Sequence, residues 1–106
     1  MTKFTRQDMA EVIQKNLAET VDMLSKAKPT DWVIWFRDID VCIGEDNQAA
    51  SPLHAQVMDQ ETAEAIAHRF SNGAGQVAIP AMHSTALAYH AESSAKLVEE
   101  LLALGE

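Results

Sequence analysis

The order of apolar and polar positions divides the chain into helical and extended segments. Residues 5 to 28 repeat apolar side chains at the spacing of an amphipathic helix, with charged residues between them. The row expected to face inward is Met9, Val12, Ile13, Leu17, Val21 and Leu24. Thr5 and Asp8 have the spacing of a capping box, and Pro29 follows the last turn. The pattern predicts a long N-terminal helix.

Residues Trp32 to Ile43 are rich in aromatic and β-branched side chains that alternate, which is typical of strands. No Gly or Pro lies within this stretch to mark a turn, so one bent strand and a hairpin turning near Arg37 and Asp38 both remain open. Two strands is the favoured interpretation, because strands of about five or six residues are the norm. Residues 44 to 52 have the composition of a loop.

Strand and helix patterns alternate again in the second half of the chain. A short strand is predicted from Leu53 to Val57, followed by a helix with Asp59 as its N-cap that carries Phe70 inward. Residues 76 to 82 form the next predicted strand, and Pro80 places it at a sheet edge or strand end. Strand, helix and strand would make a crossover unit, right-handed if both strands lie in one sheet. The residues expected to stop the helix are Asn72, Gly73 and Gly75.

The last predicted element is a long helix capped by Ser84 and running to about Leu104. Its apolar stripe consists of Leu87, Ala91, Val98, Leu101 and Leu102. The small side chains in its middle would let another helix or a sheet approach closely. Residues 1 to 106 therefore predict a single α+β domain with one hydrophobic core. Its small mixed or antiparallel sheet has three or four strands, with an N-terminal helix, a crossover helix and a long C-terminal helix.

Charge is distributed unevenly, and this feature bears most directly on function. Residues 29 to 68 hold eight carboxylates against one cation, Arg37, which gives −7 of the chain total of −8. Residues 1 to 28 sum to +1 and residues 69 to 106 to −2. Nucleic acid and anionic membranes repel such a surface, so we expect no direct binding to either. A basic protein partner is expected instead.

Cysteine usage and the absence of export signals point to the cell interior. Cys42 is the only cysteine, so no internal disulfide can form, and its apolar surroundings fit a reducing compartment. The first residues lack the pattern of a signal peptide, and no apolar run approaches the roughly 20 residues of a membrane span. We expect a soluble, cytoplasmic protein.

The residue spacings do not favour a catalytic or metal site. No two histidines have the four-residue helical spacing of a zinc site, and Cys42, flanked by Val41 and Ile43, is typical of inert core. Asp38 and Asp40 suggest a magnesium site, but no lysine lies nearby, so solvated surface acids are the better interpretation. We predict no catalytic residues, no metal and no cofactor.

The leading hypothesis is a small non-enzymatic protein that uses its acidic centre to occupy the basic surface of a nucleic-acid-handling protein. Trp32 and Trp35 point to opposite faces of a strand, so one of them is a candidate for an exposed contact. The predicted binding residues are Asp31, Trp35, Asp38, Asp40, Glu45 and Asp46. In size and charge the chain is similar to short acidic phage proteins that inhibit host nucleases or CRISPR complexes, such as anti-CRISPR proteins.

Two other hypotheses remain open. One is a self-assembling structural or accessory protein that pairs as a homodimer through its C-terminal helix, with the acidity serving solubility. The other is an enzyme or small-ligand binder built around Asp38, Asp40 and a histidine. The position of the acidic residues in space would discriminate between these hypotheses.

Overall fold

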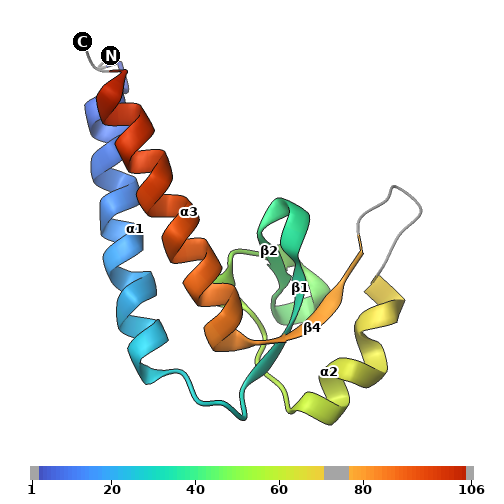
Figure 1. The fold of residues 1–106 in the computed structure, drawn as a ribbon. Helices are drawn as coiled ribbons and strands as arrows, with labels where there is room; N and C mark the ends of the chain where they lie inside the picture. The colour runs from blue at the N-terminus through green and yellow to red at the C-terminus, as the bar shows by residue number, and fades with distance from the viewer. Residues whose placement is uncertain (1–2, 71–76, 105–106) are drawn as a thin grey trace.

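A computed structural model describes residues 3–70 and 77–104, in which a four-stranded antiparallel sheet lies between two helical layers (Figure 1). The helices and strands are α1 (Arg6–Lys26), β1 (Trp32–Phe36), β2 (Val41–Ile43), β3 (Ala49–Ala50), α2 (Gln60–Ile66), β4 (Ile79–Met82) and α3 (His83–Ala103). The short 3₁₀ helices are η1 (Arg37–Ile39), η2 (Glu45–Asn47), η3 (Pro52–His54) and η4 (Ala67–Phe70). This arrangement confirms the predicted α+β class.

The sheet has the strand order β3-β2-β1-β4 and is covered on both faces. Alternate side chains of β1 therefore enter two core clusters, where one had been expected. On the side of α3, Val33 and Trp35 pack with Cys42, Ala81 and Ala86. On the side of α2 the cluster is Ile34, Phe36, Ile43, Ala67 and Ala78. A strand buried on both faces has little need of polar positions, which explains the unbroken apolar run of β1.

The stretch from Trp32 to Ile43 forms a hairpin, as favoured by the sequence. β1 and β2 pair antiparallel with Trp35 opposite Cys42. The turn between them consists of η1 and Asp40, whose φ of 50° and ψ of 49° are left-handed. Aspartate tolerates this conformation better than most residues, so the turn forms without glycine.

The predicted strand from Leu53 to Val57 is wrong. Pro52 begins a 3₁₀ turn there, and the neighbouring sheet strand is instead β3, inside the predicted loop. Isolated backbone bonds tie the segment to the sheet: Gln56 N–H donates to the Ile43 carbonyl at 2.9 Å, and Met58 exchanges two bonds with Trp32. The predicted helix does lie in a connection that crosses the sheet, since α2 joins β3 at one edge to β4 at the other. These two strands run antiparallel and are not neighbours, so they do not form the predicted strand–helix–strand unit.

The short helix and the edge strand agree with the sequence where the structure describes them. Asp59 caps α2 by accepting a hydrogen bond from the Thr62 N–H at 2.7 Å. β4 is an edge strand, consistent with Pro80. The predicted helix stop at Asn72, Gly73 and Gly75 and the predicted strand start at residue 76 lie outside the described residues.

The two long helices begin in different ways. The Oγ1 atom of Thr5 accepts from the Asp8 N–H, and Asp8 accepts from the Thr5 N–H, both at 3.0 Å, so the predicted capping box is confirmed. The predicted Ser84 cap is wrong, since α3 already starts at His83 without a side-chain cap. His83 is anchored instead by its N–H to the Asp31 carbonyl at 2.8 Å and by its Nε2 to the Pro52 carbonyl at 2.8 Å.

α1 and α3 lie side by side and run antiparallel, with their outer ends together at the chain termini (Figure 1). The fully buried residues of α1 are Ala10 and Thr20, and the Thr20 hydroxyl is satisfied by the Asn16 carbonyl at 2.8 Å. The predicted inward row is only partly correct. Ile13, Leu17 and Leu24 are half-buried, whereas Met9, Val12 and Val21 are exposed. The fully buried positions of α1 are small residues, and its larger apolar side chains are half-buried or exposed.

Candidate functional site

A short polar contact holds the β1–β2 turn to α3. Nδ1 of His90 lies 2.6 Å from Oδ2 of Asp40, and the two side chains are 18% and 23% exposed. The other carboxylate oxygen of Asp40, Oδ1, is buried and has no hydrogen-bond partner among the described residues. Asp40 therefore fixes the turn against the helix and is not a free surface charge. The sequence predicted Asp40 as one of the acidic binding residues but did not indicate its contact with His90.

An aromatic cluster lies beside this contact. The rings of Trp35 and Tyr89 meet edge to face, with centroids 5.3 Å apart and planes at 72°. The guanidinium carbon of Arg37 lies 5.8 Å from the centre of the Tyr89 ring, within the range of a cation–π interaction. The only cation of the acidic segment is thus directed to an aromatic face, and it forms no ion pair among the described residues.

The aromatic cluster borders an open hollow of about 400 Å³ between the sheet and α3. Its walls are mostly apolar, with Arg37 and Glu92 supplying opposite charges. The other lining residues are Trp35, Ile79, Ala81, Thr85, Ala88 and Tyr89. Trp35 itself is only 3% exposed, so the expectation that it is an exposed contact is wrong, and Trp32 is half-buried. Helices cover both faces of β1, so neither tryptophan side chain is fully exposed to solvent.

The remaining predicted acids are spread over separate turns. Asp38 is exposed in η1, before β2, whereas Glu45 and Asp46 are exposed in η2, after β2. Asp46 has a φ of 56°, a left-handed conformation that any replacement must tolerate. Asp31 is half-buried and precedes β1, beside the start of α3. These carboxylates therefore lie in separate turns and do not converge on one site.

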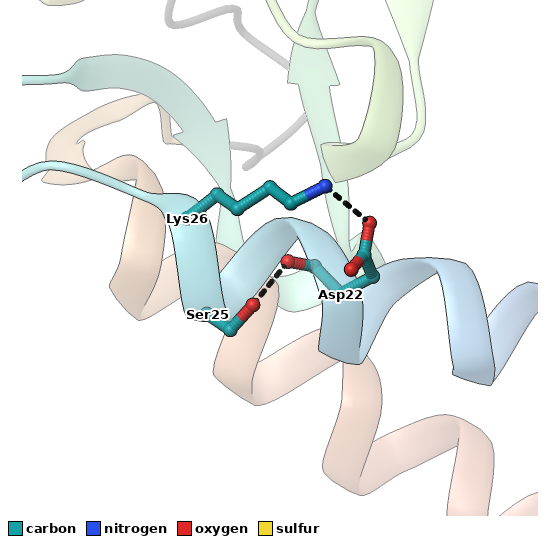
Figure 2. Close-up of polar contacts among 3 residues, drawn as sticks. All are labelled: Asp22, Ser25 and Lys26. Carbon is teal, nitrogen blue, oxygen red and sulfur yellow. Dashed lines mark hydrogen bonds and ion pairs between the residues drawn. The ribbon is translucent and has the colours of Figure 1, made fainter.

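Few of the charges on the described residues are neutralised by a neighbour. The ion pairs there are the His90–Asp40 contact and an exposed pair within α1, where Lys26 Nζ lies 3.1 Å from Asp22 Oδ2 (Figure 2). Ser25 closes the same helix turn by donating to the Asp22 carbonyl at 2.6 Å. In residues 29 to 68, six of the eight carboxylates are exposed and none of these six is paired with a cation. They are Asp38, Glu45, Asp46, Asp59, Glu61 and Glu64.

Nucleophilic and metal chemistry find little support in the part of the chain that the structure describes. Cys42 is free and fully buried, and burial, followed by the nearby Asp40 carboxylate, raises the pKa of its thiol to about 12. A thiol with this pKa is almost wholly protonated at neutral pH and is a poor nucleophile. Residues 3–70 and 77–104 contain no group of three or more His, Cys, Asp or Glu residues positioned to hold a metal ion.

Comparison of the chain with protein-family models, curated proteins and solved structures gives no match. Within the described residues, no helix has the length and apolar character needed to cross a membrane.

Proposed function

We propose that this chain is a small, non-enzymatic acidic protein that occupies a basic surface of a nucleic-acid-handling protein in the cytoplasm. One observation carries the proposal: the six exposed carboxylates of residues 29 to 68 have no cationic partner among the described residues. We call Asp38, Glu45, Asp46, Asp59, Glu61 and Glu64 the acidic surface. Like charges left unpaired oppose compaction, so although Asp59 also caps α2, the accumulation of six such carboxylates favours a role in recognition over one in folding.

The chemistry of the acidic surface selects the class of partner. Nucleic acid and anionic lipid carry the same sign of charge and are repelled, whereas Lys- and Arg-rich protein surfaces are attracted. Proteins that bind DNA or RNA present such basic surfaces, and an acidic domain seated there would exclude the nucleic acid. A phage-type inhibitor of this kind, such as an anti-CRISPR protein, is the form of the proposal that the size and charge of the chain support.

The structure determines which carboxylates a test variant can change without disturbing the fold. Asp40 is left intact because it holds His90, and Asp46 is replaced by Asn, which tolerates its left-handed backbone. The test variant is therefore Asp38→Lys, Glu45→Lys and Asp46→Asn. A control with the same change in net charge, Glu11→Lys, Glu19→Lys and Glu100→Gln, alters exposed carboxylates on α1 and α3 instead.

Crosslinking of the wild-type chain in a cell extract would identify a candidate partner, which is then purified and titrated. Duplex DNA or RNA bound to that partner should be displaced by the wild-type and control chains and at least tenfold less well by the acidic-surface variant. Association should slow as salt rises, because screening acts over about 8 to 10 Å. Equal affinity for both variants, or binding that ignores salt, would contradict the proposal.

Self-assembly through the C-terminal helix is the second candidate. The observation that favours it is the exposure of three leucines near the end of α3, namely Leu97, Leu102 and Leu104 at 45%, 45% and 64%. Light scattering across a concentration series tests whether copies of the chain associate at all.

A further inference from the structure

The outer half of the α1–α3 pair extends away from the sheet, with no other described element beside it (Figure 1). The chain measures 48 by 33 by 24 Å, and its radius of gyration is 15.3 Å. A compact domain of this length is expected near 13 Å. The outer half must therefore be stabilised by contacts between two helices alone, or by another molecule.

Few residues are fully buried between the two helices in this half. Ala10, Ser94 and Val98 are the buried residues there, and two of the three are small. Larger apolar side chains from both helices remain exposed instead. We call Phe4, Met9, Val12, Leu97, Leu102 and Leu104 the terminal patch, with exposures of 59%, 40%, 49%, 45%, 45% and 64%. These are six of the eleven exposed large apolar residues in the described chain.

Helical spacing groups some members of the terminal patch. Met9 and Val12 are three positions apart on α1, and Leu104, the C-cap of α3, lies seven positions after Leu97, so each pair falls near one side of its helix. Because the helices run antiparallel with their outer ends together, both groups lie in the same half of the pair. A monomeric protein rarely leaves so much apolar surface together without a partner for it.

The accessible surface of the chain is larger than that of a compact monomer of the same mass. The accessible surface is 7080 Å² for a mass of 11.6 kDa. A compact monomer of that mass exposes about 5,800 Å², so roughly 1,200 Å² is in excess. A standard stable interface buries about 800 Å² on each partner. The excess, summed over the whole chain, is therefore comparable to the area that one partner contributes to an interface of ordinary size.

We infer that the terminal patch is the interface of a homodimer, in which the outer halves of two α1–α3 pairs form a four-helix bundle about a twofold axis. Charge favours a second copy as the occupant. Residues 3–28 and 83–104 carry six cations and seven carboxylates, so their repulsion is small, whereas residues 29–68 carry −7. An apolar patch shared by two antiparallel helices suits the self-complementary contact that a twofold axis requires. This inference rests on self-assembly, the second candidate function, and does not depend on what the acidic surface binds.

The test measures the mass of the purified chain by sedimentation equilibrium over a wide concentration range. The wild-type chain should reach the dimer mass. Val12→Gln with Leu97→Gln should raise the dissociation constant about tenfold or more, because central apolar contacts dominate interface energy. Gln is a good helix former and leaves the charge unchanged, so the helices should persist. Ile39→Gln, at a position 46% exposed in the β1–β2 turn, is the matched control and should dimerise as the wild type does.

A second measurement locates the interface even if the Gln variant loses stability. Cys42 is buried, so a Leu97→Cys variant carries one accessible thiol. Mild oxidation should join two copies of this variant through a disulfide, while Ile39→Cys should form no covalent dimer under the same conditions. A wild-type chain that stays monomeric at all concentrations would overturn the inference. Dimers that resist the Val12 and Leu97 changes and that crosslink through position 39 would equally overturn it.

Discussion

The contact between Asp40 and His90 supports a quantitative stability prediction, because it joins two elements far apart in the sequence. Replacing Asp40 with Asn removes the charge and retains a residue that tolerates the φ of 50°. A hydrogen bond to a charged group contributes about 1.5 to 3 kcal/mol. With side chains 18% and 23% exposed, water weakens the contact, so we expect a coupling energy of about 1.5 kcal/mol, at the lower end of this range.

A double-mutant cycle isolates this coupling from other effects of the two changes. Asp40→Asn and His90→Gln are made singly and together, and the free energy of unfolding is measured by urea titration with circular dichroism. The double variant should be less destabilised than the sum of the single variants by about 1.5 kcal/mol. The cycle is needed because Asp40→Asn also alters the buried, unpartnered Oδ1. The desolvation of this oxygen offsets part of the stabilisation that the Asp40–His90 contact provides.

Asp38→Asn is the matched control, because Asp38 is exposed in the same turn and has no hydrogen bond or ion pair among the described residues. Its effect should stay within about 0.5 kcal/mol. A coupling energy below about 0.5 kcal/mol would refute the reasoning. It would mean that the 2.6 Å contact behaves as an ordinary surface ion pair and does not fix the turn to α3.

Three further predictions concern the core and the helix cap. Val98→Asp should lower the free energy of unfolding by about 2 kcal/mol or more, since Val98 is 7% exposed and the new carboxylate has no partner. Urea titration measures this loss, and a smaller loss would place Val98 at the surface. Cys42→Ala should cost about 1 kcal/mol, and the native thiol, with its pKa raised to about 12, should react slowly with a thiol reagent at pH 8; rapid labelling would contradict its burial. The hydrogen bonds from Thr62 lower the pKa of Asp59, so the cap stabilises the fold above the unfolded pKa and loses this effect as pH falls through the folded pKa. Asp59→Asn should therefore lose less stability than the wild type between about pH 5 and pH 2, and an equal loss in both chains would count against the cap.

Features that depend on neighbouring residues could be predicted from the sequence. The capping box of Thr5 and Asp8 and the cap at Asp59 are complete within three residues, so their residue types suffice to locate helix starts. Pro80 indicated the edge strand because proline cannot donate to a neighbouring strand. The hairpin was predicted only from the length of the stretch from Trp32 to Ile43, which exceeds that of a usual strand.

Features set by distant residues could not be predicted. Residues 53 to 57 alternate like a strand, but Gln56 and the following Met58 bond to Ile43 and Trp32 by isolated hydrogen bonds and not by a ladder. α3 starts at His83, two residues before the start that a Ser84 cap would give, and the Asp31 carbonyl accepts the His83 N–H. No local signal in the sequence indicates either contact.

The candidate site likewise has features that the sequence predicts and features that it does not. The sequence gives the number of acids but not their positions, which depend on β2 running back along β1 and separating Asp38 from Glu45. Asp40 looked like its acidic neighbours until His90, fifty positions away, was placed beside it. The exposure of Met9 and Val12 was missed for a related reason, because helical periodicity marks an apolar face without stating whether the same chain covers it.

The separation of charge from apolar surface limits how two copies of the chain can meet. Two acidic surfaces repel each other, whereas the terminal patches carry little net charge, so association through the patches is favoured. α1 has 21 residues and is therefore about 31 Å long, several times the screening length of about 8 to 10 Å. The acidic surfaces of such a dimer would act independently, and a partner with two basic sites would gain avidity from the dimer. The Val12→Gln and Leu97→Gln variant should then bind a single basic site as the wild type does and lose affinity only for the two-site partner. Equal losses for both partners would show that the terminal patch belongs to the basic-partner interface itself.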